Sequence, residues 1–151
     1  MSIHLASDWA ATGVVKAAMS DIKPGTFIGT ASLPQTDGSQ RAIEVVVFPE
    51  AMRGLGEGHY PWNLKPTSMM TNANIANSVD GVDGRTVTLS YKGGEKKVTI
   101  PADAPIVTFA AATAADVKPG AHVFVPAMRQ ADGTINAGRV VVGKDGVVPP
   151  M

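Results

Sequence analysis

Short apolar stretches that alternate with polar residues run along most of this chain and predict β-strands. In residues 85–91 the side chains of Val87, Leu89 and Tyr91 fall on one face, as in a strand with one buried side. A Lys-Gly-Gly turn at 92–94 and a second stretch at 95–100 complete a hairpin. Before it, residues 73–79 predict another strand, and the Asp-Gly-Val-Asp-Gly segment at 80–84 predicts a turn.

A repeat within the sequence organises these strands. The segment Asp-Ile-Lys-Pro-Gly at 21–25 matches Asp-Val-Lys-Pro-Gly at 116–120, a shift of 95 positions, and 11 of the 27 positions from 21 to 47 are identical in the two copies. Proline restricts φ and glycine accepts positive φ, so the two copies favour the same turns. The residues expected to build these turns are Lys23, Pro24, Gly25, Asp37 and Gly38 in the first copy and Lys118, Pro119, Gly120, Asp132 and Gly133 in the second.

Each copy is expected to form two strands joined by an Asp-Gly turn. The predicted strands are 26–33 with 40–48 in the first copy, and 122–128 with 134–142 in the second. The residues before each Lys-Pro-Gly turn predict one short helical turn, and Thr113 with Asp116 has the spacing of a capping box. The first copy has Ala18 at the position of Thr113 and therefore lacks half of this box.

These strands predict an all-β, mainly antiparallel fold of two small OB-like or barrel units, each with one short helical turn. A complete unit would run from about 73 to 143, whereas the first copy lacks its opening hairpin, because Ile3 already aligns with Val98 inside the unit. We therefore divide the chain into an incomplete first unit at 1–48, a connecting loop at 49–72 and a complete second unit at 73–151. Either this end of the chain is trimmed, or the first unit completes its sheet with strands from the second unit or from a neighbouring molecule.

Composition excludes several classes of protein. The 151 residues are 44% hydrophobic, which is enough to fill a core, and 13 basic residues balance 13 acidic ones. No net charge attracts nucleic acid or an anionic membrane. The chain has no cysteine, so disulfides, thiolate metal sites and cysteine nucleophiles are excluded. The first residues lack the pattern of a signal peptide, and no apolar run approaches the roughly 18 residues that span a bilayer.

A resemblance follows from the second copy, in which a Val-Asp-Gly hairpin precedes the Asp-Val-Lys-Pro-Gly turn, an apolar strand, Asp-Gly and an Ala-x-x-Val strand. This pattern resembles a bacterial family of exported, small OB-like β domains of unknown function. The segment Phe-Pro-Glu-Ala-Met-Arg-Gly at 48–54, with Gly-Glu-Gly-His at 56–59, Pro-Trp at 61–62 and Gly-Lys-Asp-Gly at 143–146, is similar to a proteobacterial group with two such units in tandem. Members of that group usually begin with a signal peptide and a complete first unit, neither of which is present here. Some carry automatic labels as metal ABC transporter permeases. The resemblance implies an OB-like fold and a periplasmic or secreted location, and it implies no activity.

The segment 49–72 has no counterpart in the second copy and holds most of the unusual side chains, so it is the first place to expect function. Its candidate ligand-binding residues are Arg53, Glu57, His59, Tyr60 and Trp62, and its candidate metal ligands are Met52 and His59. Imidazole and thioether ligands suit copper, but methionine is also common apolar filler. Tyr60 and Trp62 could stack on a sugar or peptide, or Trp62 could close the mouth of a barrel.

No catalytic motif is apparent in the sequence. His4 and His122 have no partner in the sequence, no nucleophile elbow is present, and the glycine-rich run at 54–58 lacks the Lys-Ser/Thr of a phosphate loop. We therefore expect no cofactor, and a hydrolytic enzyme is the least supported class. The first hypothesis is a non-enzymatic binding or structural module of the bacterial envelope that self-associates by strand addition. The alternative is a small-ligand or copper-type metal-binding protein that uses the 49–72 segment.

Overall fold

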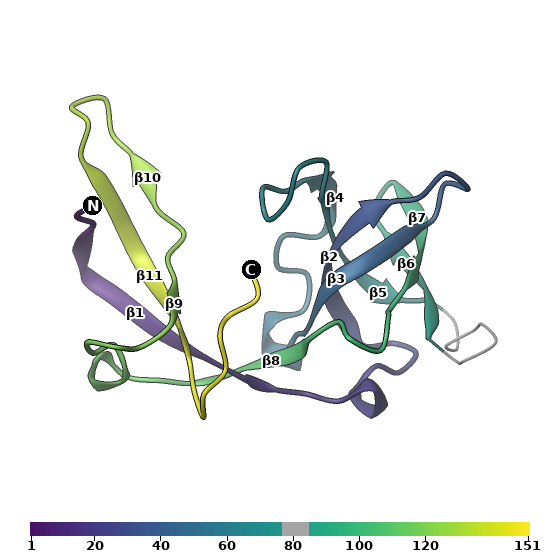
Figure 1. Ribbon diagram of the computed structural model, residues 1–151, viewed down its shortest axis with the longest axis horizontal. Coiled ribbons are helices and arrows are strands. Elements are labelled where there is room, and N and C mark those ends of the chain that lie inside the picture. The colour runs from purple at the N-terminus through teal and green to yellow at the C-terminus, as the bar shows by residue number, and fades with distance from the viewer. Residues whose placement is uncertain (77–84) are drawn as a thin grey trace. The chain divides into compact units, whose positions relative to one another are not determined.

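The computed structural model describes residues 1–76 and 85–151, and they form the all-β fold that the sequence predicts (Figure 1). The turn predicted at 80–84 and the end of the strand predicted at 73–79 lie outside these residues. The described strands are β1 (His4–Lys16), β2 (Phe27–Pro34), β3 (Gln40–Val47), β4 (Gly58–Pro61), β5 (Met69–Ile75), β6 (Thr86–Tyr91), β7 (Gly94–Thr99), β8 (Ile106–Ala111), β9 (Val123–Phe124), β10 (Met128–Arg129) and β11 (Ile135–Gly143). Short 3-10 turns occur at η1 (Met19–Asp21), η2 (Glu50–Met52) and η3 (Ala114–Asp116).

The chain forms two compact units. Unit 1 comprises residues 1–15 and 109–150, and unit 2 comprises residues 16–108 together with residue 151. This grouping differs from the expected boundaries at 48 and 72. The reason is that β5 pairs with β2 and β7 pairs with β3, so this segment joins the hairpin of the first copy and not the hairpin of the second copy that follows it in the chain.

Unit 2 contains a closed five-stranded barrel, as the OB-like prediction requires. The strand β2 pairs antiparallel with β3 on one side and with β5 on the other, β5 pairs with β6, and β6 pairs with β7. The ring closes where β7 runs parallel to β3, with Gln40 opposite Val98 and Arg41 opposite Thr99. Closure gives each of these five strands a neighbour on both sides.

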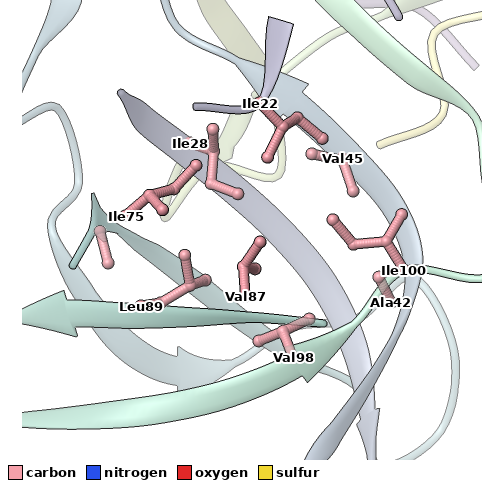
Figure 2. Packing of buried hydrophobic residues seen from close by; sticks show 10 residues of the cluster. Ile22, Ile28, Ala42, Val45, Ile75, Val87, Leu89, Val98 and Ile100 are labelled. Carbon is pink, nitrogen blue, oxygen red and sulfur yellow. The ribbon is translucent and has the colours of Figure 1, made fainter. Parts of the chain in front are cut away.

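Branched and small apolar side chains fill this barrel. They converge from all five strands and from the residue after η1, as Figure 2 shows. The buried cluster consists of Ile22, Ile28, Ala42, Val45, Ala73, Ile75, Val87, Leu89, Val98 and Ile100. The alternation of Val87 and Leu89 that predicted a strand with one buried face is therefore confirmed, since both side chains have no exposed surface.

The repeated turns have the same local geometry in both copies. Gly25 and Gly120 adopt φ values of 84° and 89°, a region that other residues rarely occupy, which explains why glycine follows Lys-Pro in each copy. An aspartate in each hairpin turn accepts a backbone hydrogen bond from the residue two positions on, at 2.9 Å for Asp37 and 2.9 Å for Asp132. Both turns are thus closed in the manner of Asx turns.

The two 3-10 turns that precede Lys-Pro-Gly share one cap. A carboxylate oxygen of Asp21 accepts a hydrogen bond of 2.8 Å from the backbone N–H of Ala18, and Asp116 accepts one of 2.8 Å from that of Thr113. Because this contact needs only a backbone donor, the alanine in the first copy does not prevent it.

Unit 1 is built around the long strand β1 and the strand β11, which run parallel (Figure 1). On the other side of β11 lie β9 and β10, both antiparallel to it. The strand predicted at 122–128 is therefore present as two short pieces, separated by a segment that contains Pro126. Proline cannot donate to a strand ladder, which accounts for the interruption.

The parallel pairs of the two units are related by the same shift of 95. In unit 2, β3 pairs with β8 so that Val45 faces Ile106. In unit 1, β11 pairs with β1 so that Val140 faces Ala11. Each Val-Val-Val strand is thus paired with a strand from the other copy of the repeat. The first copy thus pairs with strands from the rest of the chain, which is one of the alternatives that the sequence leaves open.

Candidate functional site

The segment 49–72 is an ordered part of unit 2 and not a long loop. It contains η2, the whole of β4 and the start of β5. The strand β4 adds to the barrel beside β5, with His59 opposite Thr71 and Tyr60 opposite Met70. The segment therefore contributes an additional strand, β4, to unit 2.

Arg53 holds η2 against the barrel. Its Nε donates to Glu50 at 2.7 Å, and its Nη2 donates to the backbone carbonyl of Gly25 at 2.7 Å. Its Nη1 donates to the side-chain oxygen of Asn74. The ion pair raises the pKa of Arg53 and lowers that of Glu50. All three nitrogens of this guanidinium thus have partners within the protein, and they join η2 to the first Lys-Pro-Gly turn.

Glu57 and His59 lie near the β6–β7 hairpin but make separate contacts. A carboxylate oxygen of Glu57 accepts a hydrogen bond of 3.0 Å from the backbone N–H of Lys92 in the hairpin turn. The Nδ1 atom of His59 lies 2.8 Å from Oγ1 of Thr71, and its ring stacks on Tyr91 with 6.2 Å between centroids. Burial, and then the charge of a nearby lysine, lowers the pKa of His59. The imidazole is therefore favoured in its neutral form.

Tyr60 and Trp62 contact one another, as the stacking hypothesis would require, but the tyrosine hydroxyl is occupied. Their rings meet edge to face at 6.4 Å between centroids. The Tyr60 hydroxyl donates to the carbonyl of Gly56 at 3.0 Å and accepts from the side-chain amide of Asn72 at 3.3 Å. Burial raises the pKa of this hydroxyl. Trp62 is half-buried, and its Nε1 is buried without a hydrogen-bond partner among the described residues.

The candidate ligands thus divide into three groups: Arg53 with η2, Glu57 with the hairpin turn, and His59 with Tyr60 and Trp62 along β4. None of the contacts described above joins Met52 to His59. Within residues 1–76 and 85–151, no cluster of three or more His, Cys, Asp and Glu side chains is arranged to hold a metal ion.

Sequence reasoning missed Glu44, a carboxyl group without any exposed surface on β3. Burial raises its pKa to about 8, and the backbone N–H of the cross-strand residue Ala31 only weakly opposes that rise. Neither carboxyl oxygen has a hydrogen-bond partner within the geometric limits among the described residues, so burial dominates. The signal was present in the sequence as a single acidic residue within the apolar stretch 42–47. Glu44 is consequently held in a neutral form at physiological pH.

The outer edge of unit 1 is the second feature that the sequence did not show. Within this unit, β9 and β10 pair only with β11, so their other side has no strand neighbour in the described chain. Val123 and Met128 are 45% and 72% exposed. At the equivalent position in the first copy, Ile28 is fully buried in the barrel, and its strand pairs with β5. The same repeated strand is therefore covered in unit 2 and open in unit 1.

A depression lies at equivalent positions of the two hairpins. In unit 1 a cavity of about 390 Å³ is lined by Met128, Asn136 and Ala137, among others. In unit 2 a cavity of about 410 Å³ is lined by residues at the same positions of the repeat, including Leu33, Arg41 and Ala42. Equivalent residues of the two hairpins therefore line a depression in each unit, although only one of the hairpins is enclosed in a barrel.

Among the described residues, no helix has the length and apolar character needed to cross a membrane. Comparison with protein-family models, curated proteins and solved structures yields no match to this chain.

Proposed function

We propose that this protein is a non-enzymatic β module of the bacterial envelope that self-associates by strand addition at the outer edge of unit 1. The observation that carries the proposal is the contrast between the two copies of one strand. Ile28 is enclosed in a barrel, whereas its equivalent Val123 lies at an edge with 45% of its surface exposed. Apolar, unpaired sheet edges commonly bind other strands. The envelope location rests on the family resemblance alone.

Two copies of the chain would pair through residues 122–129 of each, related by a twofold axis. Antiparallel edges are suited to this, because the same surface then serves both partners. The edge presents exposed apolar side chains at Val123 and Met128. Burying two such side chains from each copy supplies roughly 1.5–3 kcal/mol per side chain.

Pro126 does not prevent this pairing. Its equivalent in the first copy is Ala31, whose backbone N–H is directed at Glu44 of β3 and so away from β5. By the same geometry, the donor that Pro126 lacks would point toward β11 and not toward the open side. The free edge therefore keeps the donors that a neighbouring strand needs.

The test is light scattering or sedimentation equilibrium of the full chain at several concentrations. The average mass should rise with concentration, and Met128→Lys should weaken association by about tenfold or more, because a lysine on an edge opposes pairing. Val148→Lys is the matched control, since Val148 is an exposed apolar residue of unit 1 outside the edge. A wild-type protein that stays monomeric at every concentration would refute self-association.

The alternative, a ligand or metal site in the 49–72 segment, has its own test. Copper is titrated while the fluorescence of Trp62 and Trp9 is followed. A saturable change that is lost in His59→Ala would establish the metal site, and no change would exclude it. The described contacts favour the first proposal, because Arg53, Glu57 and Tyr60 already have partners within the protein.

A further inference from the structure

Unit 1 contains counterparts of three of the five barrel strands of unit 2. At a shift of 95, β9 and β10 correspond to β2, and β11 corresponds to β3. The start of β1 corresponds to the end of β7, because His4 faces Asn136 in unit 1 just as Thr99 faces Arg41 in unit 2. These three strands are joined in the same order and with the same directions as their counterparts.

Counterparts of β5 and β6 are missing from unit 1 within residues 1–76 and 85–151. In unit 2, β5 covers β2 over six positions, from Phe27 to Ser32, and β6 pairs along the whole of β7. Together these two strands join β2 to β7 and close the ring. Unit 1 is therefore a barrel with an opening two strands wide, between β9–β10 on one side and the start of β1 on the other.

Burial of the equivalent residues shows what this opening exposes. Ile28 and Ile100 have no exposed surface in the barrel of unit 2, whereas the equivalent Val123 and Leu5 of unit 1 are 45% and 39% exposed. Other apolar positions of the same hairpin stay covered, since Ala137 and Val140 are buried. The exposed apolar residues thus lie on both sides of the opening.

We infer that unit 1 accepts a two-stranded antiparallel β-hairpin of the β5–β6 type from a second polypeptide, which closes a second five-stranded barrel. The inference deepens the proposed function and rests on its premise that unit 1 binds strands. The occupant is defined by the pattern that fills the opening in unit 2. One of its strands carries small and apolar residues at alternate positions, as at Thr71, Ala73 and Ile75, and the other carries larger ones, as at Val87 and Leu89.

The repeat also predicts the register of the hairpin. Ile28 faces Ala73 and Thr30 faces Thr71 in unit 2, so Val123 and Val125 should face the corresponding residues of the occupant. On the other side, Thr99 faces Thr86, so His4 should face the position equivalent to Thr86.

The chain, in its described residues, holds one β5–β6 segment for the two repeated hairpins. Its β5 and β6 are already paired in the barrel of unit 2, and moving them to unit 1 would expose β2 and β3. Within the described residues, the hairpins β2–β3 and β9–β11 therefore have one β5–β6 segment between them, and the opening of unit 1 is free to take such a segment from another polypeptide.

The probe is a synthetic peptide of residues 69–91, titrated into the full chain at a concentration at which the chain is monomeric. We expect saturable binding by fluorescence anisotropy and slower amide hydrogen exchange at 122–129. Val123→Glu should weaken binding by about tenfold or more, since it places a charge where an apolar contact is expected. Val148→Glu should leave the affinity unchanged, and a peptide carrying Ala73→Pro should not bind.

Crosslinking tests the register, because the chain has no cysteine of its own. Val123→Cys in the chain should form a disulfide with a peptide carrying Ala73→Cys and should do so far less readily with one carrying Asn72→Cys. Protection that appears at β2 and not at 122–129 would overturn the inference, as would no binding at all. If the chain is monomeric at every concentration but binds the peptide, only the proposed self-association is refuted. If the chain self-associates but does not bind the peptide, only the inference that unit 1 accepts a hairpin is refuted.

Discussion

Glu44 should make the stability of this protein fall as the pH rises. Its pKa is about 8 in the folded chain and 4.5 as the ordinary reference value, so the folded protein holds a proton that the unfolded chain releases between these two values. The contribution of this bound proton to the stability of the fold is fully present below about pH 4.5, decreases as the pH rises, and is lost above about pH 8. The difference between the two pKa values corresponds to about 5 kcal/mol in the free energy of unfolding.

This free energy is large compared with the roughly 5–15 kcal/mol that separates the folded and unfolded states of typical domains. About two thirds of it is already lost at pH 7, because the unfolded carboxyl is ionised there while the folded one is not. Glu44→Gln replaces the carboxyl with a neutral amide of similar size. The variant should be more stable than the wild type at pH 9, and its stability should not depend on this titration.

The assay is urea unfolding followed by tryptophan fluorescence from pH 4 to pH 10 for the wild type and for Glu44→Gln. The difference between their free energies of unfolding should change by up to about 5 kcal/mol across this range, mostly between pH 5 and pH 8. Glu95→Gln, on an exposed position of β7, is the control and should run parallel to the wild type. If the Glu44→Gln profile also runs parallel to the wild type, the carboxyl is not held neutral by burial and the reasoning fails.

Two further predictions use the same unfolding measurements. Gly29→Ala should destabilise the protein by about 1–3 kcal/mol, because the added methyl group would press on the Asn72 side chain and lie 3.0 Å from Cε2 of Phe48. Gly138→Ala, where no atom lies within 4 Å of the added methyl, should change stability by less than about 1 kcal/mol, and equal effects at both sites would contradict this account of the packing. The pKa of His59 is lowered from 6.5, so its neutral form stabilises the fold above about pH 6.5 and this contribution is lost as the pH falls. His59→Gln should remove this loss of stability at acidic pH. If the free energy of unfolding has the same slope against pH below pH 6.5 in the wild type and in the variant, this prediction is refuted.

Short-range features were predictable because residues a few positions apart decide them. The Lys-Pro-Gly turns, the Asp-Gly turns and the β6–β7 hairpin all depend on positive φ at glycine, on the fixed φ of proline or on one aspartate contact. In contrast, β1 and β8 were not delimited from the sequence. The stretch 4–16 lacks a regular alternation of apolar and polar residues, and it forms a strand because β11 pairs with it.

The candidate site was only partly accessible from the sequence. Arg53, Glu57 and His59 were recognised as unusual, but their partners Gly25, Lys92 and Thr71 lie up to 35 positions away, and no local pattern indicates those contacts. The alternation within β3 could have pointed to Glu44, but the absence of a partner for its carboxyl depends on the packed surroundings.

The repeat and its turns and the all-β class follow from the residues themselves, because turn chemistry and side-chain alternation act over a few positions. The hairpin with which the β5–β7 segment pairs does not follow from the local sequence. Both copies of the repeated hairpin carry the Val-Val-Val strand that such a segment could cover, so local sequence permits either pairing. Only the tertiary structure shows that β2 and β3 take the segment, since β5 pairs with β2 and β7 pairs with β3 over a long separation in the sequence, as Ile28 opposite Ala73 illustrates. The edge left open in unit 1 is the direct consequence of that long-range choice.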